Sequence, residues 1–535
     1  LKGLRRLLRS NLSAMRRELH LSLVCLRNSL ISFEQKMSVL SRKLSRLLRD
    51  NTRWSSNVVR TIETLATEVE EQDCSHCRPY TEIPGPRPIP FLGNTWRFIP
   101  YIGDFEIQAV DQVSKRLYHE YGDIVKIESL LGRPDMVFIY DANEIERIFR
   151  QEERMPYRPS MPSLDYYKRV LRKEFFRENA GVIAVHGENW YNFRSRVQQV
   201  MLQPRTARMY VGAIEEASLA IEKIRDQNQE VPDDFLNEIH KWSLESIARV
   251  ALDVRLGCLD DDANAETQRL IDAVSTFFVN VGVLELKIPF WKLFNTPTWL
   301  QYVNALDTIY TAAALSRIRE TGNSNTEPSL LDRVLALDND TKLATILALD
   351  LFLVGIDTTS NAVASVLYQL ALHPDKQGLA YDEVCRVLPG EDIQLDGKHL
   401  NNLKYLKACI KETLRMYPVV IGNGRTMTKD TIISGYRVPK GVQVVFQHYV
   451  ISNLDKYFPR SKEFLPERWL QNDGVYHSFA SLPFGYGRRM CLGRRFAELE
   501  MLIVISKVIL LISSHNKSKI ILKNILRRFV SRFCT

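Results

Sequence analysis

Residues 484–495 read Phe484-Gly485-Tyr486-Gly487-Arg488-Arg489-Met490-Cys491-Leu492-Gly493-Arg494-Arg495 and are more informative about the fold than any other part of the chain. They place one cysteine, Cys491, between glycines and arginines, and an amphipathic helical pattern begins at Phe496. The glycines permit positive φ and close backbone approach to a neighbour. The four arginines and the N–H groups of the helix start favour a thiolate at Cys491. Because a single thiolate is one of the known proximal ligands of haem iron, the loop predicts a haem site.

The alternative for a lone cysteine is a buried structural thiol in a glycine-rich loop. Here the spacing Phe-x-x-Gly-x-Arg-x-Cys-x-Gly is complete, and it resembles the haem-binding loop of the cytochrome P450 monooxygenases. The resemblance implies haem b with Cys491 as the axial ligand of the iron. It also implies that Phe484, Arg489 and Gly493 contact the cofactor. The fold that it implies is mainly α-helical with a small β region.

The composition of the 535 residues, 45% apolar and 25% charged, is ordinary for a globular protein. Eight cysteines lie scattered without a disulfide framework, which indicates a reducing compartment. The net charge of +9 arises in residues 1–60, where 14 basic residues face 3 acidic ones, so the rest of the chain is slightly acidic. Because the basic excess is confined to one terminal segment, we predict no nucleic-acid partner.

The terminal segment 1–60 is rich in Arg, Ser and Leu and poor in acids, which is typical of a mitochondrial transit peptide. The alternative is a basic amphipathic helix that lies on a membrane or a nucleic acid. No apolar run near the N-terminus approaches the ~20 residues that span a bilayer, as a microsomal anchor would. We predict a transit-like segment at 1–60, a linker at 61–80 and a catalytic domain at 81–512, located on the matrix side of the inner mitochondrial membrane as a peripheral protein.

The domain opens with the prolines of residues 84–93, which set a stiff, extended entry and resemble the proline hinge of the family. The alternative is a proline-rich ligand of another domain. Hydrophobic periodicity then predicts a helix at 105–121, strands at 124–127 and 136–140, and helices at 213–229, 233–255 and 264–283. The aromatic, proline-broken stretch 286–300 fits either the core or a lid that dips into a membrane.

Trp190 and Arg194 lie four residues apart and share one face of a predicted helix. A cation–aromatic pair is more often structural, but a Trp N–H and an Arg together can also hold a carboxylate. The family resemblance implies the second role, with a haem propionate as the carboxylate. It implies the same role for Arg425 and Arg489.

Residues 343–373 predict one long helix in which Asp357 is the only charged residue between 351 and 374. The alternative of a transmembrane helix is weaker, because a single such segment in mid-chain is better explained as a central buried helix. A lone buried acid is costly. Gly355 leaves room for a large neighbour, and Thr358 can donate to the carbonyl of residue 354. The stretch resembles the oxygen-activating motif of the family, which implies that Asp357 relays protons and Thr358 orients water.

Glu412 and Arg415 are three residues apart on a helix predicted at 403–416, where they can pair. Taken alone this would be a surface pair of little weight. The resemblance instead implies a buried triad with Arg468 that supports the loop behind the haem.

Lys407 and Lys411 lie one turn apart on the same helix, and the usual meaning of such lysines is a solvated face. In mitochondrial members of the family, lysines at these places receive an acidic iron–sulfur ferredoxin. Arg494 and Arg495 resemble the same class of contact, since complementary charge steers an acidic partner.

Residues 513–535 form a basic pattern unlike the usual end of the family, and we predict an atypical tail there. The predicted reaction inserts one oxygen atom from O2 into a hydrophobic substrate, steroid-like or xenobiotic. Electrons would come from a ferredoxin and its NADPH-dependent reductase, as in insect mitochondrial members. One alternative is a truncated, non-catalytic haem-binding or interaction variant, to which the tail points. Another is a haem-thiolate isomerase or dehydratase, which would not need Asp357 and Thr358.

Overall fold

The computed structural model describes residues 77–158, 161–178, 180–221, 232, 234–260, 265–318, 329–389, 395–470 and 476–514. The chain divides into two units at residue 77, and the elements below belong to the second unit, Arg78–Thr535. The predicted transit-like segment at 1–60, most of the predicted linker, and the tail from 515 onward lie outside the described residues.

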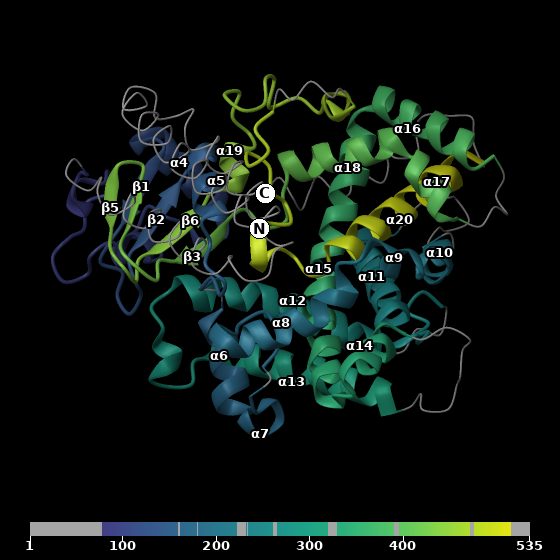
Figure 1. Cartoon of the computed structure of the whole chain (residues 1–535), viewed down its shortest axis with the longest axis horizontal. Helices are drawn as coiled ribbons and strands as arrows, with labels where there is room; N and C mark the ends of the chain where they lie inside the picture. Colours follow the sequence, from purple (N-terminus) through teal and green to yellow (C-terminus); the bar gives the residue numbers. More distant parts are fainter. Residues whose placement is uncertain are drawn as a thin grey trace, which may run out of the picture. The chain divides into compact units, whose positions relative to one another are not determined.

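The described chain is mainly helical, with a small β region at one side (Figure 1). The longer helices are α4 (Val110–Tyr121), α8 (Gly187–Met201), α11 (Phe235–Leu252), α12 (Ala265–Leu286), α13 (Pro297–Ile318), α15 (Thr341–Leu372), α16 (Pro374–Val387), α18 (Lys404–Met416) and α20 (Arg494–Ser514). The shorter helices are α5 (Ala142–Arg150), α6 (Pro162–Tyr166), α7 (Lys173–Phe176), α9 (Pro204–Arg208), α10 (Val211–Leu219), α14 (Leu330–Asp338), α17 (Gly397–Asn402) and α19 (His448–Ile451). The predicted fold class is therefore confirmed.

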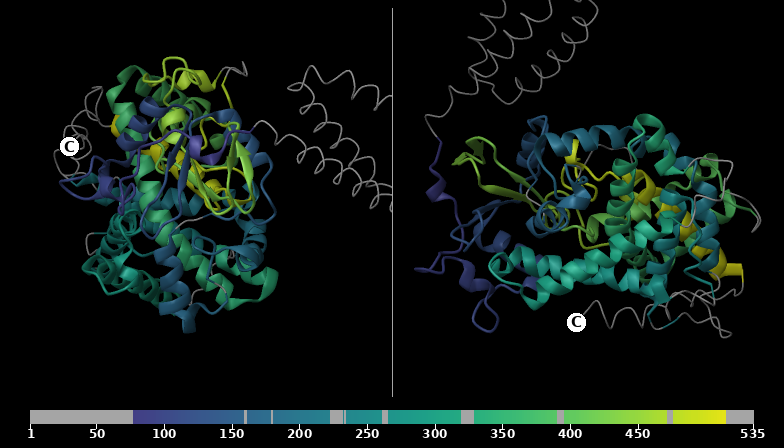
Figure 2. Two further views of the ribbon diagram at one scale, coloured as in Figure 1. Left: turned by 90° about the vertical axis from the view of Figure 1, so that its left-hand side faces the viewer. Right: turned by 90° about the horizontal axis from the view of Figure 1, so that it is seen from below.

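The main sheet has the strand order β1-β2-β6-β3. Its strands are β1 (Ile124–Ile127), β2 (Met136–Ile139), β3 (Asn423–Thr426) and β6 (Gln443–Phe446). β1 and β3 are antiparallel to their neighbours, whereas β2 and β6 are parallel and join segments about 300 residues apart. A separate hairpin pairs β4 (Thr431–Ile433) with β5 (Tyr436–Val438). Figure 2 shows from two further directions that the strands gather beside the helical part.

Helix α15 is the centre of the helical part, where α11, α12, α13, α14, α18 and α20 pack against it. The Asp340 side chain caps its start by accepting from the Leu343 N–H, and Pro374 follows its end. By length and composition α15 is the one described helix that could cross a membrane, yet 67% of its most apolar window is buried inside the protein. The prediction of a buried central helix is confirmed.

One predicted helix start differs from the structure, and the stretch 286–300, for which two roles were open, is partly buried and partly exposed. The helix predicted from residue 105 begins at Val110, after a 3-10 turn at Ile107–Ala109. In the stretch 286–300, Trp291 and Trp299 are buried and stack with ring centroids 4.7 Å apart, whereas Leu293 is 80% exposed. Core and surface roles therefore coexist in this stretch, because Trp291 and Trp299 pack inward while residues 292–295 are exposed.

Candidate active site

The cysteine loop is closed by its own backbone. The Cys491 N–H donates to the Phe484 carbonyl at 2.9 Å, and a 3-10 turn at Gly487–Arg489 lies between them. Gly487 has φ of 75°, and a Cβ on it would lie 2.6 Å from Oε2 of Glu152. Gly493 differs from the prediction, because its φ is not positive and a Cβ there would meet no atom within 4 Å. The chain thus leaves open space beside Gly493, two residues after the thiol.

The arginines of the loop predicted a lowered pKa and a thiolate at Cys491, but in the structure the pKa of this thiol is raised. Burial raises the pKa of the thiol, although N–H groups of Gly493 and Arg494 and the charges of Arg194 and Arg158 oppose this shift. The residue is nevertheless exposed, so Cys491 borders an open space within the surrounding chain. A bound metal ion would reverse the shift, since a coordinating thiol is deprotonated outright.

Four arginines from distant parts of the chain converge near Cys491. Arg194, Arg425 and Arg489 are buried, and Arg158 stands beside them. Burial, together with repulsion from the neighbouring arginines, lowers the pKa of Arg489 to about 9 and that of Arg158 to about 10. Arg158 was missed in the sequence, where only the prolines beside it mark the position.

This arginine cluster (Arg158, Arg194, Arg425 and Arg489) fits haem. Among the described residues, the one carboxylate ion-paired with any of the four is Glu152, 2.6 Å from Nε of Arg425. Nη2 of Arg425 and Oε2 of Glu152 are buried without a hydrogen-bond partner in the described structure. Four cations and one acid leave three positive charges, and two haem propionates with a thiolate carry three negative ones. Unpaired buried charge is costly, so such a cluster calls for an anionic ligand.

Trp190 and Arg194 lie on one buried face of α8, as predicted, but they contact different groups. The guanidinium of Arg489 lies 3.7 Å from the centroid of the Trp190 ring. Arg194 donates through Nη2 to the Met490 carbonyl at 3.0 Å and so holds the residue before Cys491. Arg489 also donates to the carbonyls of Pro156 and Val185, which fixes its position in the cluster.

On α15, the predicted hydrogen bond is present: Oγ1 of Thr358 donates to the Val354 carbonyl at 2.7 Å. Asp357 is not the isolated buried acid that the sequence indicated. Its side chain is partly exposed, and Oδ1 lies 3.5 Å from Nε2 of His240 on α11. His240 is 117 residues away in sequence and lies on an otherwise ordinary helical pattern, so no local signal marks it.

Gly355 leaves room for a large neighbour, as predicted. A Cβ on it would lie 2.5 Å from Cδ1 of Ile247 on α11. The large neighbour that approaches Gly355 is therefore a helix of the same chain. This close packing of α11 on α15 is what places His240 beside Asp357.

The structure brings Glu412, Arg415 and Arg468 together as a buried network. Glu412 accepts from Nε and Nη2 of Arg415 at 2.8 and 2.7 Å and from Nε of Arg468 at 2.9 Å. Nε1 of Trp469 donates to the same carboxylate at 2.9 Å. Arg415 also donates to the Ser452 carbonyl at 2.7 Å, so the network ties α18 to the segment that leads toward the cysteine loop.

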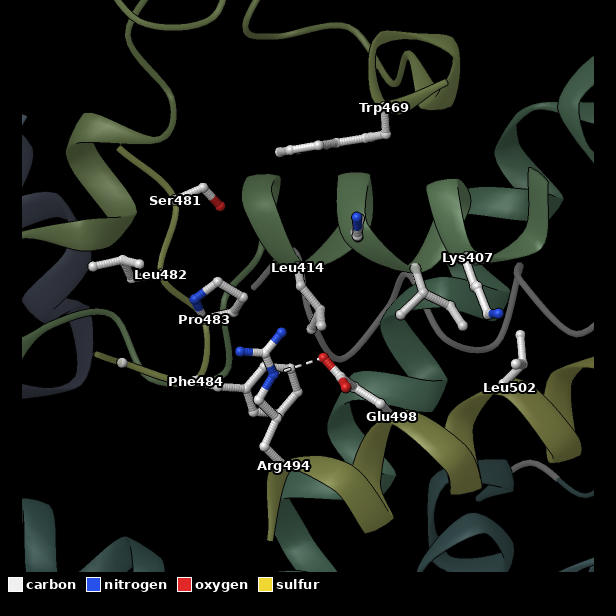
Figure 3. Close-up of a pocket in the computed structure, with 13 residues that line it drawn as sticks. Lys407, Leu414, Trp469, Ser481, Leu482, Pro483, Phe484, Arg494, Glu498 and Leu502 are labelled. Atoms are coloured by element: carbon white, nitrogen blue, oxygen red, sulfur yellow. Dashed lines mark hydrogen bonds and ion pairs between the residues drawn. The ribbon is translucent and has the colours of Figure 1, made fainter. Parts of the chain in front are cut away.

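The four predicted partner-binding residues lie near the facing parts of α18 and α20. Lys411 is exposed and Lys407 is partly buried, and neither forms a salt bridge among the described residues. Arg494 and Arg495, predicted as contacts of the same class, already have an acidic neighbour, because Glu498 pairs with Arg494 at 2.8 Å and lies 3.8 Å from Arg495. Lys407, Lys411 and Arg494 line a pocket of about 470 Å³ (Figure 3).

Comparison with known proteins agrees with the site. The Cytochrome P450 family profile matches residues 83–529. The protein named Probable cytochrome P450 301a1, mitochondrial, from Drosophila melanogaster is 50% identical over 450 residues, which cover 81% of each chain. Probable cytochrome P450 49a1 from the same organism is 45% identical over 474 residues, covering 84% of this chain and 80% of the relative. Probable cytochrome P450 12a5, mitochondrial, also from Drosophila melanogaster, is 34% identical over 478 residues, covering 84% and 87%. The resemblance carried by the cysteine loop is confirmed, and the chain belongs to the cytochrome P450 family of haem-thiolate monooxygenases.

Proposed function

We propose that Cys491 is the axial ligand of haem b and that the arginine cluster holds the two propionates. The observation that carries this proposal is the excess of three positive charges beside an accessible thiol. We assign Phe484 and Gly493 to the same site, because the Phe484 carbonyl accepts from the Cys491 N–H and a Cβ on Gly493 would meet no atom within 4 Å. When bound, haem supplies a redox-active iron at which O2 is activated, so that one oxygen atom enters the substrate and the other leaves as water.

Protons for this reaction would pass along α15 through Asp357 and Thr358. The Thr358 hydroxyl gives its hydrogen to the Val354 carbonyl, so its lone pairs remain available to a water molecule. Asp357 is partly exposed, directly precedes Thr358 on α15, and has Oδ1 3.5 Å from Nε2 of His240. We assign proton relay to Asp357, water positioning to Thr358, and orientation of Asp357 to His240.

We propose that electrons come from an acidic [2Fe–2S] ferredoxin, which an NADPH-dependent reductase reduces. Lys407 and Lys411 support this proposal because they are cations without a salt bridge on the described face beside the cysteine loop. Arg494 and Arg495 contribute less, since each is close to Glu498. Two of the relatives above carry the word mitochondrial in their names, the compartment in which we place this chain.

The proposed location is the matrix side of the inner membrane, with peripheral contact through two apolar segments. Phe91 is 97% exposed and Ile102 is 70% exposed in the first segment, and Leu293 and Phe294 protrude from the second. The turn at residues 131–133 contacts both apolar segments. The Leu131 N–H donates to Thr95 in the first segment, and Arg133 donates to the carbonyl of Lys287, a few residues before Leu293 in the second. Apolar side chains on one side of a soluble fold favour insertion into a lipid surface.

The substrate class that we propose is hydrophobic and steroid-like or xenobiotic. The support is the partly exposed face of α15 that carries Thr358, where Leu351 and Val354 are apolar. A site with few polar groups beside a large apolar helix surface binds hydrophobic molecules best.

A reduced-CO difference spectrum of the full chain tests the proposal. We expect a band near the haem-thiolate position, its loss in Cys491→Ser, and its retention in the matched control Cys385→Ser, which changes a partly buried thiol elsewhere. A thiolate band that survives in Cys491→Ser would show that the ligand is wrong. Reduction of the haem by ferredoxin, reductase and NADPH, compared with reduction by dithionite, then tests the electron donor.

A further inference from the structure

The pocket between α18 and α20 has an apolar interior. Trp469 closes one side, and Phe484 with the paired Arg494 and Glu498 forms another (Figure 3). The remaining apolar lining residues are Ile410, Leu414, Leu482, Pro483 and Leu502. A volume of about 470 Å³ exceeds the space that one large side chain needs. The haem site does not account for this pocket, and the proposed function uses mainly its lysines, Lys407 and Lys411.

The pocket is nevertheless directly connected to the metal ligand. Phe484 forms part of its wall, and the carbonyl of Phe484 accepts the hydrogen bond of the Cys491 N–H at 2.9 Å. Any group that fills the pocket therefore contacts a residue one hydrogen bond away from the thiol residue. A donor protein seated there would bring its redox centre toward the cysteine loop.

The charged residues that line the pocket determine which kind of side chain can bind in it. Glu498 is matched by Arg494, whereas Lys407 and Lys411 have no salt bridge among the described residues. Burial, followed by the neighbouring charge of Arg208, lowers the pKa of Lys407, and the charges of Glu383 and Glu498 only partly oppose this shift. An apolar pocket with unpaired lysines at its edge fits an apolar side chain flanked by carboxylates.

We propose that this pocket receives an apolar side chain of the acidic electron-donor protein, with Lys407 and Lys411 meeting carboxylates around it. The inference rests on the ferredoxin donor of the proposed function and adds what holds the complex together. Exposed lysines are screened by salt and mainly speed the encounter. A buried anchor slows dissociation, so the pocket sets the affinity.

The test uses haem-loaded full chain and a recombinant acidic [2Fe–2S] ferredoxin, with Kd measured over a series of salt concentrations. Ser481 lines the pocket and is only partly buried, so Ser481→Trp fills the pocket without a change of charge. Leu482→Trp fills it from the neighbouring position and serves if the first variant does not fold. Ser478→Trp is the matched control, because Ser478 is exposed in the same loop and does not line the pocket.

We expect the filling variants to raise Kd ~10-fold or more at every salt concentration, with the salt dependence unchanged. Lys411→Gln should instead flatten the salt dependence, and Ser478→Trp should bind like the unmodified chain. Reduction by dithionite and the CO band need no donor and should persist in all of them. Equal binding by filled and unfilled pockets would overturn the inference alone. Failure of the unmodified chain to bind ferredoxin at any salt concentration would overturn the proposed donor as well.

Discussion

Lys168 and Asp350 form a buried ion pair across 182 residues of sequence, with Nζ 2.6 Å from Oδ1. Lys168 also donates to the Ala180 carbonyl at 3.0 Å, and the other oxygen of Asp350 accepts from the Val182 N–H at 3.0 Å. Asp350 precedes Asp357 by seven residues, or about two turns of α15. The pair therefore fastens the segment between α6 and α8 to the helix that carries the proposed proton relay.

Removal of one partner of this pair should destabilise the protein strongly. Asp350→Asn leaves the Lys168 ammonium buried without a counter-charge, and the expected loss is about 3–5 kcal/mol of unfolding free energy. Denaturant unfolding of the haem-loaded protein measures this loss. The double variant Lys168→Met with Asp350→Leu, which removes both charges, should recover much of it. A loss below about 1 kcal/mol in Asp350→Asn would contradict the burial seen here.

Arg158 should have opposite effects with and without haem. In the absence of propionates the four arginines of the cluster repel one another, so Arg158→Gln should leave the haem-free protein as stable or more stable. With haem bound, the same change removes a partner of a carboxylate, at a cost of about 1–3 kcal/mol. Thermal unfolding of both forms and the rate of haem transfer to a scavenger protein measure these effects. Arg87→Gln, at an exposed arginine outside the cluster, is the control. Equal changes in the unfolding temperature of the haem-free and haem-bound proteins would argue against contact between Arg158 and a propionate.

Glu500 should make stability depend on pH. Burial raises the pKa of this carboxyl to about 7, with a smaller opposing effect from the hydroxyl of Ser246, which donates to it at 2.8 Å. The folded state thus holds a proton that the unfolded state releases near pH ~4.3. Stability should fall as pH rises from ~4.5 to ~7 and stay lower above that range.

The variant Glu500→Gln keeps the neutral form at every pH. Its unfolding free energy should equal that of the unmodified protein near pH 4.5 and exceed it by about 3 kcal/mol at pH 8. Denaturant midpoints at several pH values give the comparison. A constant difference between the two proteins across this range would show that Glu500 does not titrate as its burial requires.

Asp357→Asn should uncouple electron use from product formation. Without an ionisable group at this position, we expect product per NADPH consumed to fall ~10- to 100-fold, while ferredoxin affinity stays unchanged. In His240→Phe, product per NADPH consumed should also fall, but by a smaller factor, because this change removes only the residue that orients Asp357. Simultaneous measurement of NADPH, peroxide and product tests this. If product per NADPH consumed is unchanged in Asp357→Asn, Asp357 is not part of the proton path.

The sequence by itself determined the features that depend on local spacing. The cysteine loop, the Thr358 bond to residue 354, the pairing of Glu412 with Arg415 and the strand at 124–127 all follow from residues a few positions apart. Backbone period and turn chemistry act over that range, so the pattern predicts the element and the fold class with it.

Only the tertiary structure decided which distant groups meet. Arg158 and Glu152 beside the cysteine loop, His240 beside Asp357, and Lys168 on Asp350 come from separate elements. The direction of the Cys491 pKa also changed, because desolvation by the surrounding chain outweighs nearby charge. Burial and long-range charge depend on how helices and strands cross, and no spacing along the chain encodes that crossing.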